Sequence, residues 1–395
     1  MPPFSDISLS PAKSGQQGSN TSARELSAPP FWQYCIVYAS HMSTYDLPFT
    51  CLLYRVFVGL ETMSNGESNV KENVREYYGS KLQTNADLKT TACCAASIPK
   101  KLRALLKDIH ENVLEKFYGC GSPLPEGLEG CTVLDLGSGS GRDSFVASRL
   151  VGAHGTVIGV DMTEEQLAVA RAHVDWHMER YGYDKANVTF RHGVIEDLAS
   201  MGIADASVDV CVSNCVLNLS PDKAQVLREI FRVLKPGGEL YFSDVFCDRR
   251  LPGTLREDQE VLGECLGGAL YIEDVRRLLA ELGCKDYRIM EQTEIQITDE
   301  AIAAKVGLAR FFSLTLRCFK LPELEDRCED FGQFATYLGT LDPVSFELDQ
   351  GHQFEAGRAR AVCGNTAAMV SAGIDGMRVL KSILSAWGRW QGERE

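Results

Sequence analysis

The stretch Leu134-Asp-Leu-Gly137-Ser-Gly139-Ser-Gly141 decides the fold of this chain. It continues an apolar run at residues 131–136, which predicts a buried strand, and it leads into a helical pattern at residues 143–151. Glycines at alternate positions between a strand and a helix let the backbone approach a ligand at the carboxyl end of the strand. The stretch therefore predicts a nucleotide pocket, and a tight turn without a ligand is the alternative.

Outward from this turn, strand patterns alternate with helical patterns. The alternation predicts an α/β protein with a doubly wound, Rossmann-like parallel sheet. From residue 291 short alternating runs around turns predict a smaller C-terminal α+β domain. The further strands are expected at residues 156–160, 188–191, 208–213 and 239–245, and the further helices at residues 164–180, 222–234 and 272–282.

The sequence ahead of the sheet predicts an extension and a helical segment. Residues 1–62 form the expected N-terminal extension, because residues 1–30 are rich in Ser, Pro, Gly, Gln and Asn and lack the apolar side chains of a core. Polar residues interrupt the more apolar residues 31–60, so no membrane span is expected there. An apolar face at residues 99–119 predicts a helix. The expected domains are thus residues 1–62, a helical segment with a thiol motif at 63–120, the ligand-binding sheet domain at 121–290 and the C-terminal domain at 291–395.

Charge and cysteine content exclude several classes of partner. The chain has 395 residues, with 40 basic and 54 acidic side chains and a formal net charge of −14. Such a surface repels phosphate backbones and anionic lipid heads, so neither nucleic acid nor a membrane is expected as a partner. The 14 cysteines occur without a recognisable secretory signal, which favours a reducing compartment, and the expected location is cytoplasmic. There, cysteines outside a core are candidates for soft-ion or redox chemistry.

Two acidic residues indicate which ligand the pocket holds. Asp161 ends the second expected strand about twenty residues after the glycine turn, where a carboxylate that binds ribose belongs. A hydride-transfer fold and a methyltransferase fold share these features. Asp135, just ahead of the glycines, favours the methyltransferase, because its charge suits the ammonium and sulfonium groups of S-adenosylmethionine and would repel a pyrophosphate.

Two later motifs strengthen this interpretation. With Gly193-Val-Ile195-Glu196-Asp197 and Lys235-Pro-Gly-Gly238, the chain resembles class I S-adenosylmethionine-dependent methyltransferases. The resemblance implies that Met162 and Ile195 enclose adenine, with Glu196 near its amino group; ordinary core packing is the alternative for the two apolar residues. The predicted cofactor residues are Asp135, Gly137, Ser138, Gly139, Gly141, Arg142, Asp161, Met162, Ile195, Glu196 and Asn214.

Three cysteines lie in segments around the expected ligand edge of the sheet. Cys215 follows the fourth strand in Ser213-Asn-Cys-Val-Leu-Asn218, and Cys265 lies in Gly263-Glu-Cys-Leu-Gly-Gly268. Cys120 lies between glycines ahead of the first strand. A single cysteine is more often a small buried hydrophobe than a ligand, but three near one edge indicate a thiol site.

These motifs identify a family resemblance. Residues 72–369 resemble arsenite S-adenosylmethionine methyltransferases, through the motifs above, Tyr118-Gly-Cys-Gly121 and Asp87-Leu-Lys-Thr-Thr-Ala-Cys93-Cys94. The resemblance implies that Cys120, Cys215 and Cys265 bind trivalent arsenic, with Cys93 or Cys94 as a fourth thiol. It also implies S-adenosylmethionine as methyl donor, glutathione or thioredoxin as thiol reductant, and thiol conjugates of arsenite and methylarsenite as substrates. Soft arsenic selects soft thiolate ligands, which agrees with this reading.

Two other functions stay open at this point. A class I methyltransferase of a small organic acceptor, such as a quinone or a sterol, would leave the cysteines incidental. A non-catalytic arsenic or zinc thiolate binder would use the same cysteines without methyl transfer. Trp176 and His177 are expected to be surface or packing residues, and Cys363 has no assigned role. The cysteines expected to serve packing are Cys131, Cys211, Cys247, Cys284 and Cys318.

Overall fold

The computed structural model describes residues 100–117, 119, 121, 123–372 and 381–382. Several predictions concern residues outside this part: the extension at 1–62, residues 63–99 of the helical segment, the thiols of Cys93, Cys94 and Cys120, and the end of the C-terminal domain beyond residue 382. Among the described residues, no helix has both the length and the apolar character to cross a membrane.

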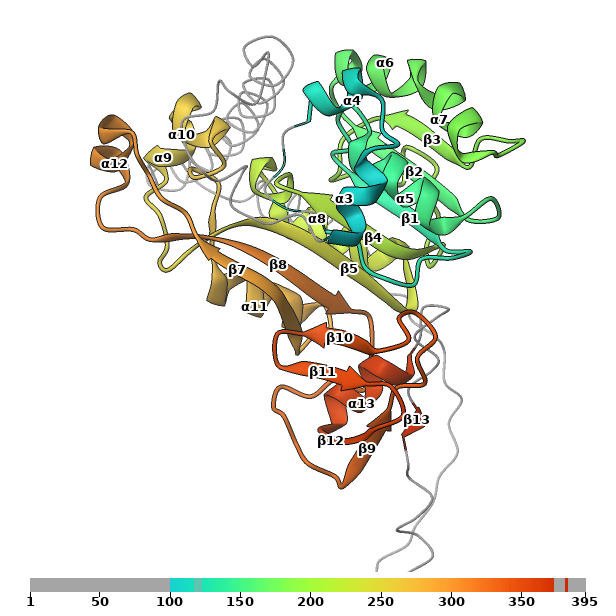
Figure 1. Ribbon diagram of the computed structural model, residues 1–395. Coiled ribbons are helices and arrows are strands. Elements are labelled where there is room, and N and C mark those ends of the chain that lie inside the picture. Colours follow the sequence, from blue (N-terminus) through green and yellow to red (C-terminus); the bar gives the residue numbers. More distant parts are fainter. Residues whose placement is uncertain (1–99, 118, 120, 122, 373–380, 383–395) are drawn as a thin grey trace, which may run out of the picture. The chain divides into compact units, whose positions relative to one another are not determined.

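The centre of the fold is an eight-stranded sheet in the order β3-β2-β1-β4-β5-β8-β7, with β6 paired to β5 (Figure 1). Strands β1 to β5 are parallel, and the alternating strand and helix patterns predicted this arrangement correctly. The order reverses between β1 and β4, so the loops after these two strands diverge and leave a crevice at the carboxyl edge. The parallel strands are β1 (Thr132–Leu136), β2 (Thr156–Asp161), β3 (Val188–His192), β4 (Val208–Asn214), β5 (Leu234–Cys247) and β6 (Leu270–Tyr271).

Helices connect these strands, and two of the predicted long helices are each divided. His110 separates the first two helices because its Nδ1 accepts a hydrogen bond from the amide of Asn112 at 3.2 Å and caps the second. His173 separates α6 from α7 without a side-chain cap: its backbone amide donates to the carbonyls of Ala170 and Arg171 at the end of α6. The helices up to β6 are α3 (Lys100–Leu106), α4 (Glu111–Glu115), α5 (Arg142–Val151), α6 (Glu164–Ala172), α7 (Val174–Tyr181), the 3-10 turn η4 (Leu217–Leu219), α8 (Lys223–Val233), α9 (Thr254–Glu257) and α10 (Gln259–Gly263).

Two antiparallel strands extend the sheet beyond β5. Strands β8 (Phe311–Phe319) and β7 (Tyr287–Glu294) follow α11 (Ile272–Glu281), and α12 (Glu300–Val306) lies between them in sequence. A buried ion pair between Arg317 and Glu239 at 2.9 Å joins β8 to β5. The domain boundary expected at residue 291 falls inside β7, so the central sheet runs on to residue 319.

The C-terminal region carries two small sheets and one helix, as the short alternating runs indicate. Strand β10 (Ser345–Asp349) pairs with β11 (His352–Glu355), and β9 (Gln333–Thr336) pairs with both β12 (Ala359–Val362) and β13 (Lys381–Ser382). Helix α13 (Gly364–Ser371) follows β12. Arg288 of β7 and Asp349 of β10 form an ion pair at 3.2 Å, which connects this region to the central sheet.

The core contains the side chains that the sequence assigns to packing. Trp176 is 40% exposed, whereas His177 is fully buried and stacks on Phe145 at 3.6 Å between ring centroids. Both expectations for this pair, surface and packing, are confirmed. Burial also confirms the packing role of Cys131, Cys211, Cys247, Cys284 and Cys318.

Candidate active site

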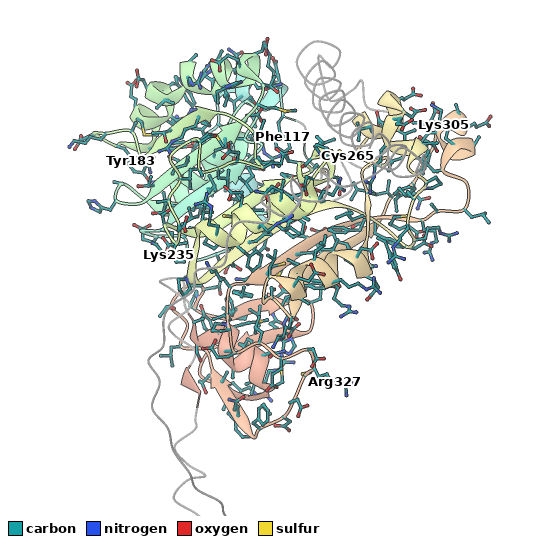
Figure 2. All side chains as sticks on the ribbon, turned by 180° about the vertical axis from the view of Figure 1, so that it is seen from behind. Phe117, Tyr183, Lys235, Cys265, Lys305 and Arg327 are labelled. Carbon is teal, nitrogen blue, oxygen red and sulfur yellow. The ribbon has the colours of Figure 1, made fainter. Side chains whose placement is uncertain are left out.

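A cavity lies at the carboxyl edge of the sheet, where the strand order reverses. The loops after β1, β2, β3 and β4 supply its lining, together with Lys116 and Phe117 from the segment ahead of β1 (Figure 2). Residues far apart in sequence therefore meet at one crevice. The predicted cofactor residues that line it are Asp135, Gly137, Ser138, Gly139, Asp161, Met162, Ile195, Glu196 and Asn214.

The glycine turn is held open by the acid at the end of β2. Asp161 accepts hydrogen bonds from the amides of Gly139 at 2.9 Å and Thr163 at 2.8 Å. Gly137 and Gly139 have φ angles of 68° and 52°, a left-handed conformation that glycine adopts without steric cost. A β-carbon at Gly137 would lie 2.3 Å from a methyl of Val216, so a larger residue would displace the loop after β4.

Buried carboxylates give the cavity a negative lining. Burial, reinforced by the negative charge of Asp143, raises the pKa of Asp135 to about 7. Ser144 Oγ donates to Asp135 at 2.5 Å and favours the ionised form. Burial also raises the pKa of Asp161. A carboxylate that is costly to ionise when alone becomes ionised when a cation lies beside it, so this site suits a positively charged ligand.

Gly141 and Arg142 belong to the motif but are not among the cavity's lining residues. Gly141 begins α5 with a φ of 93°, and a β-carbon there would lie 2.9 Å from Phe190. Arg142 donates to Asp143 at 2.6 Å and to the carbonyl of Gly121 at 3.2 Å. Gly141 thus allows close packing at the start of α5, and Arg142 links α5 to the segment ahead of β1, which also contributes to the cavity lining.

Several lining residues escape prediction from the sequence. Asp143 lines the cavity and accepts a hydrogen bond from Asn214 Nδ2 at 2.8 Å. The guanidinium of Arg142 lies over the ring of Phe117, and its central carbon is 3.2 Å from the ring centroid. The position of Asp143 just after the glycine motif is a signal that a helix N-terminus contributes, whereas the sequence places Phe117 on the apolar helical face at residues 99–119 and not in a ligand cavity. The other lining residues that were not predicted are Lys116, Ser140, Thr163, Gln166, Gly193, Val194, Val216, Leu219, Ser220 and Pro221.

The structure brings Cys215 and Cys265 together. Cys215 lines the cavity, and the thiol of Cys265, which is labelled in Figure 2, donates to the Cys215 carbonyl at 3.8 Å. Both have a left-handed backbone, with φ angles of 59° and 61°, and among the described residues only Ala206 is a further non-glycine residue with positive φ. Such strain costs about 1–3 kcal/mol per residue and occurs mainly at functional sites. Cys215 and Cys265 are 3% and 0% exposed, and their role as arsenic ligands stays a prediction.

Tight contacts fix the loops that carry the two cysteines. A β-carbon at Gly268 would lie 2.0 Å from the carbonyl oxygen of Asn218, so only glycine allows this approach. Asn218 donates its amide to the Asp244 carboxyl at 3.1 Å. Burial raises the pKa of Asp244 to about 7. The buried Asp244 therefore anchors the loop after β4 from the end of β5.

The neighbours of Cys120 reach the same place. Asn214 Nδ2 donates to the carbonyl of Gly121 at 2.8 Å, and the amide of Gly121 donates to Asn214 Oδ1 at 3.1 Å. A β-carbon at Gly119 would lie 2.8 Å from the Asn214 side chain. Cys120 is outside the described residues, so its role as the third arsenic ligand stays a prediction.

Cys215 is disulfide-bonded in this structure. A disulfide sulfur has no thiolate to offer a soft ion. Cys215 would thus need reduction before it could act as a ligand.

The donor set fits S-adenosylmethionine. Buried carboxylates face the cavity where positive charge would lie, and the buried Ser138 Oγ has no hydrogen-bond partner among the described residues. An unsatisfied buried hydroxyl is costly unless a ligand completes its hydrogen bonding. The fold and this cavity define a class I S-adenosylmethionine-dependent methyltransferase.

Comparisons with known proteins give the family. A family model described as a methyltransferase domain matches residues 128–291. An arsenite methyltransferase of Aquipseudomonas alcaligenes is 57% identical over 302 residues (76% of this chain, 87% of the relative), and one of Mus musculus is 44% identical over 313 residues (78% and 82%). The solved arsenic(III) S-adenosylmethionine methyltransferase of Chlamydomonas reinhardtii is 49% identical, with a TM-score of 0.70 over 73% of this chain and 96% of that one. The chain belongs to the arsenite methyltransferase family.

Proposed function

We propose that this protein transfers methyl groups from S-adenosylmethionine to trivalent arsenic held by its own thiolates. The observation that carries the proposal is the adjacency of Cys215 and Cys265, both in a strained backbone, with Cys215 in the lining of the cofactor cavity. A thiol-bound arsenic atom on this pair would lie beside the cofactor. Methylarsenic and dimethylarsenic species are the proposed products.

The cofactor residues have separate roles in binding. We assign Asp161 to the ribose hydroxyls and Asp135 to the ammonium group, because both carboxylates are buried in the lining. Met162 and Ile195 would enclose adenine, and Glu196, held by Ser220 Oγ at 2.7 Å, would accept from its amino group. When bound, S-adenosylmethionine supplies an electrophilic methyl group on a positively charged sulfur.

The protein's thiols prepare the acceptor. Arsenite exchanges its three oxygen ligands for thiolates, and we assign Cys120, Cys215 and Cys265 to this set, with Cys93 or Cys94 as a further thiol. Arsenic retains its lone pair in that state, so it can take up a methyl cation without a general base; this oxidises arsenic by two electrons, and thiols must supply two electrons, as a disulfide, to return it to the trivalent state. Residues of the site therefore act by positioning arsenic and by excluding water.

A thiol reductant completes the cycle in this proposal. The disulfide at Cys215 must be opened before that thiolate can bind arsenic, and glutathione or thioredoxin can supply the thiols. We further propose that arsenite and methylarsenite arrive as thiol conjugates. A reducing compartment, the cytoplasm, would keep the thiols of the site in their reduced form.

One assay tests the proposal against its two rivals. Purified protein is incubated with arsenite, S-adenosylmethionine and reduced glutathione or thioredoxin, and methylated arsenic species are separated and quantified over time. Accumulation of methylarsenic that requires all three components supports the proposal. Arsenic binding without methyl transfer would favour a thiolate binder, and neither binding nor transfer would favour a methyltransferase of an organic acceptor.

A further inference from the structure

A second pair of cysteines lies in the C-terminal region, outside the lining of the cofactor cavity. Cys328 is exposed and Cys363 is 8% exposed; the neighbouring Cys363 raises the pKa of Cys328, and Cys328 lowers the pKa of Cys363. Cys363 is the N-terminal cap of α13, where its sulfur accepts from the amide of Thr366 at 3.4 Å. The pair is thus accessible from one side and supported by a helix on the other.

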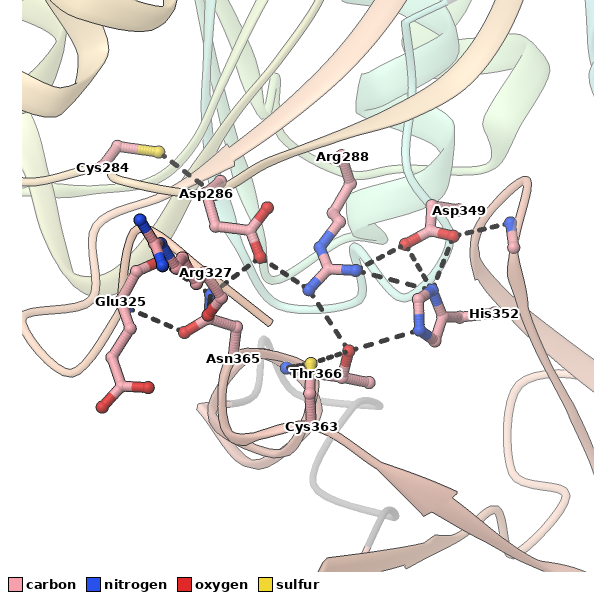
Figure 3. Close-up of polar contacts among 11 residues, drawn as sticks. Cys284, Asp286, Arg288, Glu325, Arg327, Asp349, His352, Cys363, Asn365 and Thr366 are labelled. Atoms are coloured by element: carbon pink, nitrogen blue, oxygen red, sulfur yellow. Dashed lines mark hydrogen bonds and ion pairs between the residues drawn. The ribbon is translucent and has the colours of Figure 1, made fainter. Parts of the chain in front are cut away.

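Backbone and side-chain contacts hold the two thiols in register. The amide of Gly364, next to Cys363, donates to the carbonyl of Glu329, next to Cys328, at 2.9 Å. The buried Asn365 accepts from the amide of Glu325 at 2.8 Å and donates to the carbonyl of the same residue at 2.8 Å (Figure 3). The loop that carries Cys328 is therefore fastened to the start of α13, and the dithiol is preorganised.

A positive charge supports the thiolate form of Cys363. Arg288 donates to Asp286 at 2.8 Å, to Asp349 at 3.2 Å and to Thr366 Oγ1 at 3.2 Å, which fixes its guanidinium beside the pair (Figure 3). Burial alone would raise the pKa of Cys363, but hydrogen bonds from Cys328, Thr366 and Arg288 lower it to about 7. Cys363 is consequently a nucleophilic thiol near neutral pH.

Cys284 and Cys318 form a buried pair that can be compared with Cys328 and Cys363 in exposure and in thiol pKa. Cys284 and Cys318 also lie in contact, but both are at most 1% exposed. Burial raises the pKa of Cys318 well above its usual value. That pair has neither an entry path nor a stabilised thiolate, so it serves packing.

We propose that Cys328 and Cys363 form a dithiol site for a monomethylated trivalent arsenical. The choice of ligand rests on the proposed function, which makes this species in the first methyl transfer. A methylated arsenic atom keeps its carbon bond and has two exchangeable oxygen ligands, which matches two thiols. Two As–S bonds form and two As–O bonds break, the two thiol protons leave with the oxygens as two waters, and no electrons are transferred.

The number of donors argues against zinc and against arsenite as the species bound by Cys328 and Cys363. Among the described residues, no group of three or more His, Cys, Asp or Glu side chains is placed to hold a metal ion. Zinc in structural sites takes four protein ligands, and arsenite has three exchangeable positions. A two-thiol site is therefore complete only for a centre that needs two ligands.

Binding stoichiometry tests the site separately from methyl transfer. Full-length reduced protein is mixed with methylarsonous acid without S-adenosylmethionine, and bound arsenic per chain is measured by native mass spectrometry. Relative to wild-type protein, Cys328→Ser or Cys363→Ser should lower the bound arsenic by one equivalent per chain, whereas Cys284→Ser, the matched control from the buried pair, should leave the number of equivalents unchanged.

Each outcome separates the two proposals. An unchanged number of bound equivalents in Cys328→Ser and Cys363→Ser, with a native circular dichroism spectrum, would overturn the dithiol site. Tighter binding of arsenite or Zn²⁺ than of methylarsonous acid at this pair would overturn the ligand class. Failure of wild-type protein to methylate arsenite would overturn the proposed function alone, since the stoichiometry measurement requires no methyl transfer.

Discussion

The cofactor side and the thiol side of the site are built differently. On the cofactor side, residues close in sequence form the turn after β1, and its left-handed positions are glycines, which pay no steric cost. On the thiol side, Cys215 and Cys265 are 50 positions apart and themselves adopt the left-handed backbone. A local sequence motif specifies the cofactor side, whereas tertiary contacts between two loops specify the thiol side.

This difference predicts different responses to mutation. The glycine turn is supported by the strand and helix that flank it, so loss of one ligand contact should weaken binding without disturbing the rest. The thiol loops depend on close approaches such as that of Gly268 to Asn218, and their cysteines bond directly to the substrate in the proposed mechanism. Substitutions on the thiol side should therefore have the larger effect on turnover.

The largest effect is expected for the thiols themselves. Cys215→Ser and Cys265→Ser should each lower turnover about 100-fold or more on both arsenite and methylarsenite, because arsenic loses its position beside the cofactor. Cys120→Ser should lose most turnover with arsenite yet still methylate methylarsenite, since that substrate has only two exchangeable ligands. Rates of each variant on each substrate, with cofactor affinity as a check on folding, measure this.

Cys131→Ser provides the matched control, because this buried cysteine serves packing. It should keep the wild-type ratio of rates on the two substrates. Equal loss on both substrates in Cys120→Ser would contradict the ligand count, and wild-type rates in all three thiol variants would eliminate the thiolate site.

The next effect is on the cofactor side. Asp161→Ala should weaken S-adenosylmethionine binding by about 1–3 kcal/mol, because the ribose hydroxyls lose a charged acceptor. Arsenic binding should be unchanged, which would show that the two halves are independent. Calorimetric titration measures both affinities, with the exposed Asp184→Ala as control; unchanged cofactor affinity would remove Asp161 from the pocket.

The sequence predicts the cofactor side better than the thiol side. Asp161 and the glycine turn are readable because a strand, a turn and a helix place them locally. The sequence also indicates Cys215 and Cys265, but their strained backbone and mutual contact depend on the packing of Gly268 against Asn218. The periodicity at residues 99–119 includes Phe117 as an apolar residue of a helix, but its place in the cavity depends on its tertiary contact with Arg142.

The fold shows the same division. Parallel strands β1 to β5 follow from alternating patterns, whereas the antiparallel β7 and β8 look irregular in sequence and extend past the boundary expected at residue 291. Their place depends on the buried pair of Arg317 with Glu239, two charged residues that a composition-based reading would assign to the surface.

A smaller effect is expected from pH on the cofactor side. The pKa of Asp135 is raised to about 7 in the protein without a ligand. Binding of a cation favours the ionised carboxylate, so below pH 7 a proton must leave first. The affinity for S-adenosylmethionine should therefore fall up to about tenfold per pH unit below 7 and level off above it.

Titration calorimetry between pH 5.5 and about 8.5, in buffers of different ionisation enthalpy, measures both the affinity and the proton released. In Asp135→Asn the affinity should be lower at neutral pH and the slope should disappear. A slope that persists in Asp135→Asn would assign the proton to another group.

The smallest effect is expected for the N-terminal extension, which belongs to neither half of the site. A chain that starts at Met63 should retain the wild-type rate and cofactor affinity, because residues 1–62 carry none of the motifs that define the cavity or the thiol loops. Residues 1–30 also lack the apolar side chains that would stabilise a packed contact. Residues 31–60 are more apolar, so their removal tests more severely whether the extension packs on the rest of the protein. Activity, cofactor affinity and the proportion of soluble protein are compared for the two chains. A large loss of activity or solubility on truncation would show that residues 31–60 pack on the body of the enzyme, and a deletion of residues 2–30 alone would then locate the effect.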